Sequence, residues 1–414
     1  MRANSSPIVS GLAPFAAAGL LCSALSAWGA IDLPPGEGRD IVAAKCSLCH
    51  PLELRIGSGY TQEGWNTVLR MMTNHGAPVT AQEVAVIAPY LAKAFPEKGK
   101  SDGVIIAGPH KVSMQIWKAT TPGARPHDAL ATRDGAYWYT GQMANVLGRV
   151  DPKTGKVKEF ALKTPHSGPH GLMEDRDGNI WYTGNTAALI GKLNPKTGAV
   201  TEYPMPDPVK DPHTLVFDAK GILWFTAQNS NRIGRIDPKT NEVKLLTLPT
   251  AGARPYGMTV SSKGTIYIAE FGTNGVAAVD PSTLEVREYK LPDEKARPRR
   301  ITITSDDIVW YTDYSRGFLG RLDPATGKVT EWASPSGAKS GPYGISTIKD
   351  VIWYSESETT PNTVVRFDPK TQKFQTWAIP GGGNIVRNTS VTPSGNFLLA
   401  NSLVNTLTLV KIEK

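Results

Sequence analysis

The sequence predicts a mainly β protein: a seven-bladed β-propeller with four-stranded blades, preceded by a small all-α domain. Three observations predict this fold. A block of residues recurs along positions 112–414, and each repeat contains four short strand candidates. A Cys-x-x-Cys-His motif stands in a helical segment before the first repeat.

The repeat is marked by an Asp/Asn-Pro-x-Thr turn. It begins at six positions: Asp151, Asn194, Asp237, Asp280, Asp323 and Asp368. Four successive intervals are 43 residues and the last is 45. Apolar and polar residues alternate beside each turn, as over Lys156–Phe160, which is typical of strands. Four short strands at such constant spacing predict a propeller blade, because a β-sandwich would not keep the period.

The blade count follows from the ends of the repeat region. Six full blades start near His127, His170, His213, Tyr256, Arg299 and Tyr343. The tail 385–414 holds three more strand candidates and lacks a fourth. Residues 112–118 carry the fourth-strand pattern, so we expect both ends of the region to close a seventh blade. Such closure leaves no unpaired terminal edge.

The chain divides into four predicted segments: a signal peptide at 1–30, a cytochrome c domain at 31–100, a linker at 101–111 and the propeller at 112–414. Arg2 precedes an apolar stretch from Ile8 to Leu25, and cleavage is expected after Gly29 or Ala30. Gly11 and Pro14 interrupt this stretch, which is short for a membrane span. We therefore expect export to the periplasm or secretion, with no integral membrane span once the signal is removed.

The net charge of +8 is spread along the chain, and only Arg297–Arg300 is locally dense in basic residues. A nucleic-acid-binding domain would concentrate its basic residues on one helix or patch. The composition therefore argues against a nucleic-acid partner. A small-molecule substrate or a redox partner protein is expected instead.

Cys46, Cys49 and His50 form the Cys-x-x-Cys-His motif of covalent c-type haem attachment. The thiols form thioethers to the porphyrin, and the imidazole becomes the proximal iron ligand. A zinc site would need further ligands, yet the third cysteine, Cys22, leaves with the signal peptide. The motif therefore predicts haem c as a covalent cofactor.

The segment around the motif predicts three helices: Gly38 to Lys45, Trp65 to Asn74, and one that a Thr80/Glu83 capping box begins and that ends near Ala94. It resembles small cytochrome domains whose last helices carry Gly-Trp-x6-Met and Tyr-Leu-Ala, here Gly64–Met72 and Tyr90–Ala92. The resemblance favours Met72 as the sixth haem ligand, with Met71 and His75 as alternatives.

Two slots of the repeat should form rings around the propeller axis. The slot before the first strand holds His127, His170, His213, Tyr256, Arg299, Tyr343 and Arg387. The slot after the second strand holds Gly141, Gly184, Ala227, Glu270, Asp313, Glu356 and Asn401. Packing alone does not require such variation between blades, whereas a binding face would produce it. The set suits a divalent cation with a polar ligand, or proton abstraction by a histidine; the alternative is a solvated channel mouth without chemistry.

The propeller resembles the streptogramin (virginiamycin B) lyase family, whose repeat carries Pro-His-Gly, Trp-Phe-Thr-Glu and Ile-Gly-Arg-Ile. That family opens a cyclic depsipeptide ester by elimination, with a histidine base, a substrate-binding histidine and Mg²⁺ held by acidic residues. The resemblance implies that Asp211-Pro212-His213 supplies a metal-binding acid and the base. His170 falls on the substrate histidine. Ala227-Gln228 stands where the second metal-binding acid is expected, and Glu270 is the candidate to replace it.

Three functions are open at this point. The first is a metal-assisted lyase that opens a cyclic ester or lactone-type substrate. The second is a periplasmic electron-transfer protein or oxidoreductase whose propeller binds a substrate or partner, which the fused haem favours. The third is a binding propeller without catalysis.

Overall fold

The computed structural model describes residues 33–48, 52, 56, 59–74 and 76–413. The predicted signal peptide therefore lies outside the described residues, as do Cys49, His50 and His75. Within the described part of the chain, no helix combines the length and apolar character that crossing a membrane requires.

The segment before the propeller is helical. It contains α1 (Arg39–Lys45), η1 (Cys46–Leu48), α3 (Gln62–Asn74) and α4 (Ala81–Ala94). The predicted capping box is confirmed: the Thr80 hydroxyl accepts from Glu83 N, and the Glu83 carboxylate accepts from Thr80 N. Trp65, Ile87 and Leu91 lie in one buried apolar cluster that holds the helices together. The three predicted helices are thus present, and the cytochrome identity of this segment stays a prediction.

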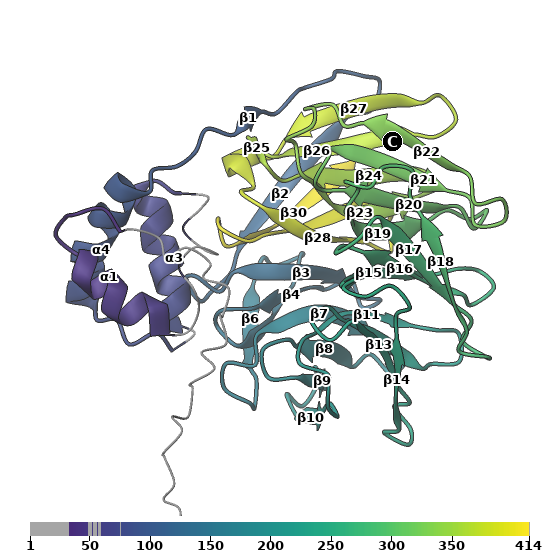
Figure 1. Ribbon diagram of the computed structural model, residues 1–414, viewed down its shortest axis with the longest axis horizontal. Helices are drawn as coiled ribbons and strands as arrows, with labels where there is room; N and C mark the ends of the chain where they lie inside the picture. The colour runs from purple at the N-terminus through teal and green to yellow at the C-terminus, as the bar shows by residue number, and fades with distance from the viewer. Residues whose placement is uncertain (1–32, 49–51, 53–55, 57–58, 75, 414) are drawn as a thin grey trace, which may run out of the picture.

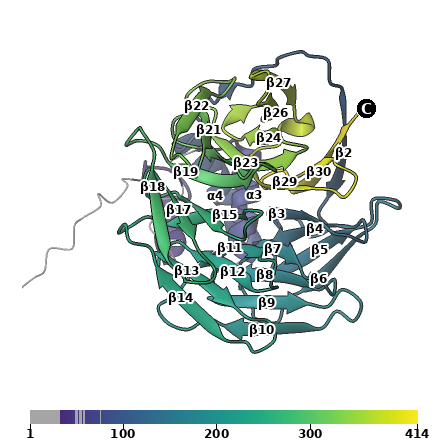
Figure 2. The same cartoon turned by 90° about the vertical axis from the view of Figure 1, so that its right-hand side faces the viewer.

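The rest of the chain forms a propeller of seven four-stranded antiparallel sheets, as predicted (Figures 1 and 2). The strands of the first three blades are β3 (Pro126–Ala131), β4 (Tyr137–Gly141), β5 (Val146–Val150) and β6 (Val157–Ala161); β7 (Pro169–Glu174), β8 (Ile180–Gly184), β9 (Leu189–Leu193) and β10 (Val200–Pro204); and β11 (Pro212–Phe217), β12 (Leu223–Ala227), β13 (Arg232–Ile236) and β14 (Val243–Thr247).

Blades four to six follow the same order. Their strands are β15 (Pro255–Val260), β16 (Ile266–Glu270), β17 (Gly275–Val279) and β18 (Val286–Lys290); β19 (Pro298–Ile303), β20 (Val309–Asp313), β21 (Phe318–Leu322) and β22 (Val329–Ala333); and β23 (Pro342–Ile348), β24 (Val351–Glu356), β26 (Thr363–Asp368) and β27 (Lys373–Ala378).

Both ends of the repeat region close the seventh blade. Its strands β28 (Val386–Val391), β29 (Phe397–Asn401) and β30 (Thr406–Ile412) are completed by β2 (Val112–Lys118), which pairs antiparallel with β30 from Val112↔Ile412 to Lys118↔Thr406. The earliest and latest strands of the propeller thus share one sheet, and this pairing ties the ring shut.

Repeated side chains explain why the blades pack alike. The second strands contribute fully buried tryptophans, among them Trp138, Trp181 and Trp224. In four blades an aromatic ring of the second strand covers a glycine of the third, where a β-carbon would lie 2.0 Å from the ring. These pairs are Tyr139/Gly148, Tyr182/Gly191, Phe225/Gly234 and Tyr311/Gly320. Glycine is required there because any side chain would occupy the position of the ring.

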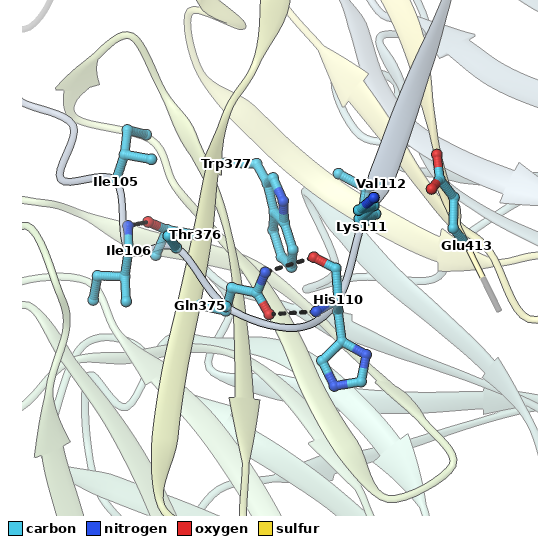
Figure 3. Close-up of a pocket in the computed structure, with 11 residues that line it drawn as sticks. Ile105, Ile106, His110, Lys111, Val112, Gln375, Thr376, Trp377 and Glu413 are labelled. Carbon is cyan, nitrogen blue, oxygen red and sulfur yellow. Dashed lines mark hydrogen bonds between the residues drawn. The ribbon is translucent and has the colours of Figure 1, made fainter.

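The linker is a strap bonded across blade six (Figure 3). β1 (Ser101–Asp102) pairs in parallel with β25 (Thr359–Thr360). Ile106 N donates to Thr376 Oγ1 at 2.7 Å, and Thr376 N donates to Ile106 O at 3.0 Å. The Gln375 side chain accepts from His110 N and donates to His110 O at 2.6 Å. The strap and β27 line a cleft of about 400 Å³.

The helical segment lies on the propeller face at which the inner strands begin. Asn74 Nδ2 donates to Pro122 O at 3.1 Å, in the loop before β3. A β-carbon on Gly76 would lie 3.4 Å from the His166 ring, in the loop before β7. Figure 1 shows the helices beside this face, and in Figure 2 α3 and α4 lie behind the inner strands.

Candidate functional site

Each inner strand carries a β-bulge at its start, and the bulge brings two successive residues to the axis. In blade one the register passes from Pro126↔Gly141 to Ala129↔Tyr139, so the His127–Asp128 pair stands outside the ladder. The register also shifts at the start of every other inner strand, and in blade five only Arg299 stands outside the ladder, because Arg300 pairs with Thr312. A bulge re-aims side chains in this way at barrel rims and beside active sites.

The first bulge residues form a ring around the axis, which we call the axial ring. Its members are the seven residues of the first predicted slot: His127, His170, His213, Tyr256, Arg299, Tyr343 and Arg387. The centroids of neighbouring side-chain rings are 3.5 Å apart for His127 and His170, 3.8 Å for His170 and His213, and 4.0 Å for His213 and Tyr256. The structure therefore brings these residues together.

The three histidines form the imidazole arc of the ring. Each has at most 4% of its surface exposed. Burial lowers the pKa of all three well below the usual imidazole value, and the nearby arginines lower it further. The arc is therefore neutral at pH 7.

The residue after each histidine decides its hydrogen bonding. His127 Nδ1 pairs with Asp128 Oδ1 at 2.8 Å, and His213 Nδ1 pairs with Thr214 Oγ1 at 3.0 Å. Gly171 follows His170, because a β-carbon there would lie 2.4 Å from the carbonyl oxygen of His213. His170 Nδ1 is consequently buried without a hydrogen-bond partner among the described residues.

Tyr256, Arg299, Tyr343 and Arg387 form the tyrosine–arginine arc. The Arg299 guanidinium carbon lies 3.8 Å from the Tyr343 ring centroid and 5.1 Å from that of Tyr256. The Tyr256 and Tyr343 hydroxyls hydrogen-bond each other. Arg387 Nε donates to Ser402 Oγ at 2.9 Å.

The second bulge residues form a layer below the axial ring that the sequence interpretation missed. Arg300 donates to Asp128 Oδ1 at 3.2 Å and to Thr214 Oγ1 at 3.1 Å. Asn388 Nδ2 donates to Asp128 Oδ2 at 2.6 Å. These four side chains line a channel of about 210 Å³. Their signal was present, since the position after each predicted ring residue also varies between blades.

The predicted carboxylates of the second slot do not lie on the axis. Asp313 accepts from Arg316 Nε at 2.6 Å, in the loop that follows β20. Glu356 accepts from Thr363 Oγ1 at 2.6 Å, on the third strand of its own blade. Glu270 Oε2 accepts from Thr273 Oγ1 at 2.8 Å and lies where a β-carbon of Gly275 would stand. Burial raises the pKa of Glu270 to about 8, with a further contribution from Glu288. These carboxyl groups hold loops and strands together.

Asp211 lies beside the axial ring and accepts from the backbone N–H of Asn229 at 3.1 Å. Burial raises its pKa to about 6. Pro212 pairs with Ala227, so the position where the family resemblance implies a second acid is next to Asp211 and holds a methyl group.

One group of three possible metal ligands occurs among the described residues: His127, Asp128 and His170. Neither Asp211 nor Glu270 belongs to it. Arg300 already neutralises Asp128 from 3.2 Å, which leaves that carboxylate a poor ligand for a cation.

The sequence profile of the Virginiamycin B lyase family matches residues 100–367 and 250–408, most of the chain. The chain belongs to the virginiamycin B lyase family. The predicted resemblance of the propeller is thereby confirmed, and the matched residues include the axial ring and the layer below it.

Solved structures of such lyases have the same fold. A streptogramin B lyase structure is 26% identical, with a TM-score of 0.67, over 73% of this chain and 98% of that one. Virginiamycin B lyase from Staphylococcus aureus is 24% identical, with the same TM-score, over 73% of this chain and 99% of that one. A catalytically inactive histidine-to-alanine variant of that enzyme, with quinupristin, is 23% identical over the same shares, with a TM-score of 0.67. Among curated proteins, none matches the sequence.

The helical segment outside the matched range carries the described part of the predicted haem site. Cys46 is a free, half-buried thiol packed against the apolar helical cluster, and burial raises its pKa. On α3, Met71 is buried and Met72 is half-buried.

Proposed function

We propose that this protein is an exported haem c protein whose propeller opens a cyclic ester or lactone-type substrate by proton abstraction at His213. One observation carries the proposal: in a virginiamycin B lyase family propeller, His213 is a buried, neutral imidazole whose ring centroid lies 3.8 Å from that of His170. A neutral imidazole can accept a proton, and burial keeps it neutral at pH 7.

The hydrogen bonds of His213 select its basic atom. If Nδ1 carries the hydrogen and donates to Thr214 Oγ1, the Nε2 lone pair is free. Thr214 Oγ1 has a second lone pair, which accepts from Arg300. In an elimination, Nε2 takes a proton from carbon, the C–H electrons form a C=C bond, and the C–O ester bond breaks. The electron pair of that bond leaves on a carboxylate.

His170 is suited to orient the substrate. It contacts His127 on one side and His213 on the other, so its ring is fixed. Its Nδ1 has no hydrogen-bond partner among the described residues. A buried, unsatisfied ring nitrogen beside the base is available to a polar atom of the substrate.

The described residues do not fit the expected Mg²⁺ site. Magnesium prefers several oxygen ligands in octahedral geometry. Asp211 faces Ala227 where a second acid would be needed. Glu270 Oε2 accepts from Thr273, and neither Glu270 nor Asp211 belongs to the one group of possible metal ligands among the described residues. No step of the proposed reaction is therefore assigned to a metal.

Cys46, Cys49 and His50 would hold the haem, with Met72 as the proposed sixth ligand and Met71 or His75 as alternatives. The haem would supply one-electron transfer. Export to the periplasm or outside the cell accompanies this proposal, because the haem motif follows a signal-like segment.

The proposal is tested with full-length, haem-loaded protein and quinupristin, with Mg²⁺ or with a chelator. Elimination gives a linear product of unchanged mass, whereas hydrolysis adds the mass of one water. We expect His213→Ala to slow product formation by about 10²–10⁴-fold. His110→Ala, which removes the strap imidazole outside the axial ring, should keep the wild-type rate. A wild-type protein that leaves the ester ring intact in both conditions would refute the lyase proposal.

A redox function is the second candidate, and the position of the helical segment favours it. The helices that would carry the haem lie on the propeller face that bears the axial ring, joined through Asn74 and Pro122. A substrate or redox partner at the ring would then lie under the haem-bearing segment. A change in the haem absorption spectrum when a candidate donor is added would support electron transfer. A protein that binds a ligand, but shows neither turnover nor a spectral change, would be a binding propeller.

A further inference from the structure

Two arginines of the axial ring have no carboxylate partner among the residues that the structure describes. Arg300, in the layer below, is paired with Asp128 at 3.2 Å. Arg299 and Arg387 form no ion pair among the described residues, and Arg299 Nε has no hydrogen-bond partner there. Asp128 is the one carboxylate within the two bulge layers, and it is already shared by Arg300, Asn388 and His127.

Aromatic rings enclose Arg299 without neutralising it. Its guanidinium carbon lies 3.8 Å from the Tyr343 ring centroid, 4.2 Å from that of Tyr314 and 4.8 Å from that of Phe271. Such faces orient a guanidinium and remove water from it. Arg299 itself is half-buried, so its charge remains available to a ligand.

The surroundings of Tyr343 show the excess of positive charge. Burial would raise the pKa of this hydroxyl, yet Arg299, Arg387 and Arg300 together hold it below its usual range. The neutral imidazole arc supplies no compensating charge. An anion bound at the ring would remove this imbalance.

We propose that Arg299 and Arg387 form an oxyanion-binding site at the axial ring, and that its ligand is a carboxylate. Guanidinium groups bind carboxylates with directed, charge-assisted hydrogen bonds. The site would hold a carboxylate of the substrate or, resting on the proposed function, the carboxylate that leaves when the ester opens. In that second role the two arginines supply the positive charge that a metal ion beside Asp211 would otherwise supply.

The test measures binding without turnover. Calorimetric titrations of the full-length protein use succinate and, separately, inorganic phosphate, at ionic strength fixed with chloride. We expect saturable binding of succinate, weakened about tenfold or more by Arg299→Gln and by Arg387→Gln. Arg287→Gln, on the outer strand β18, removes the same charge away from the axis and should bind as the wild type does. If a variant does not fold, the Tm of the wild type is measured with increasing succinate at fixed ionic strength, and we expect it to rise.

Three results would overturn the inference. One is the absence of saturable succinate binding. Another is binding that Arg299→Gln and Arg387→Gln leave unchanged, and the third is tighter binding of phosphate than of succinate. Failure of the proposed function is distinguishable, because succinate binding that persists while quinupristin stays intact removes the lyase proposal alone. Ester opening without succinate binding removes the oxyanion site alone.

Discussion

The two arcs of the axial ring occupy the same backbone position, yet their chemistry is opposite. His127, His170 and His213 are buried and neutral, and the centroids of neighbouring imidazole rings lie 3.5–3.8 Å apart. Tyr256, Arg299, Tyr343 and Arg387 combine phenols with two cations that form no ion pair within the described part of the chain. The propeller thus places proton acceptors in blades one to three, phenols in blades four and six, and positive charge in blades five and seven. An elimination that forms a carboxylate requires both poles.

The propeller repeat can carry a functional site because its backbone is constant while its bulge side chains vary. The bulge and the strand pairings recur in every blade, so the backbone of the ring is set by packing. The bulge side chains point to the axis and contact one another, so each blade can carry a different residue. Asp128 links the two arcs through Arg300. It contacts His127 in its own blade and Arg300 across the channel, and the Arg300 guanidinium carbon lies 5.3 Å from the Tyr256 ring centroid.

The largest expected effect comes from Asp128→Ala, which breaks the link between the arcs. Asp128 and Arg300 are only 2% and 3% exposed, so the substitution leaves a buried guanidinium without its counter-ion. Removing one partner of a buried pair costs about 3–5 kcal/mol. Urea denaturation followed by tryptophan fluorescence should show a loss of that size.

Two control variants test the cause of this loss. Asp134→Ala removes a carboxylate whose side chain is 55% exposed and pairs with Arg149, and should cost less than about 1 kcal/mol. The double variant Asp128→Leu/Arg300→Met replaces both charges and should recover most of the stability. A single Asp128 variant as stable as the wild type would show that the arcs are not joined through this pair.

The next largest effect comes from His170→Gln, which should change how the stability of the protein depends on pH. Because the folded-state pKa of His170 is depressed, the unfolded chain binds a proton near pH 6.5 that the folded protein does not. The stability contribution is therefore present above pH 6.5 and lost as the pH falls below it. At about 1.4 kcal/mol per pH unit, one such histidine costs about 2 kcal/mol at pH 5. We expect His170→Gln to lose about 2 kcal/mol less than the wild type between pH 7 and pH 5.

The difference in stability between the wild type and His170→Gln cancels the opposing contributions of the buried carboxyl groups. Glu270 and Asp211 have raised pKa values, about 8 and about 6, so they favour the folded protein as the pH falls. Their contributions are common to the wild type and His170→Gln. Parallel stability profiles for the two would mean that His170 is protonated in the folded state.

The sequence predicted the propeller and the axial ring because both follow from a strict period. Equivalent residues in a 43-residue repeat must occupy equivalent places, so His127 and Arg299 were expected on one ring. The second bulge layer was missed because strand alternation assigns successive residues to opposite faces, whereas the bulge turns Asp128 and Arg300 to the axis as well.

The carboxylates of the second slot could not be placed from their spacing. Asp313, for example, faces Arg316 of the following loop, and a period does not say which side of a strand a long side chain takes. The strap was equally hidden, since Ile106 and Thr376 are far apart in the sequence and meet only once the ring has closed.

The smallest expected effect comes from Tyr256→Phe, which changes the tyrosine–arginine arc without changing its charge. The substitution removes the hydrogen bond between the Tyr256 and Tyr343 hydroxyls and keeps the aromatic ring, whose centroid lies 4.0 Å from that of His213. A lost hydrogen bond of this kind costs about 1 kcal/mol. Burial raises the pKa of Tyr256 to about 12, so this cost should be the same at pH 5 and pH 7, unlike that of His170→Gln. A Tyr256→Phe profile that changes with pH would mean that the two arcs titrate as one unit, because a phenol with that pKa does not ionise in this range.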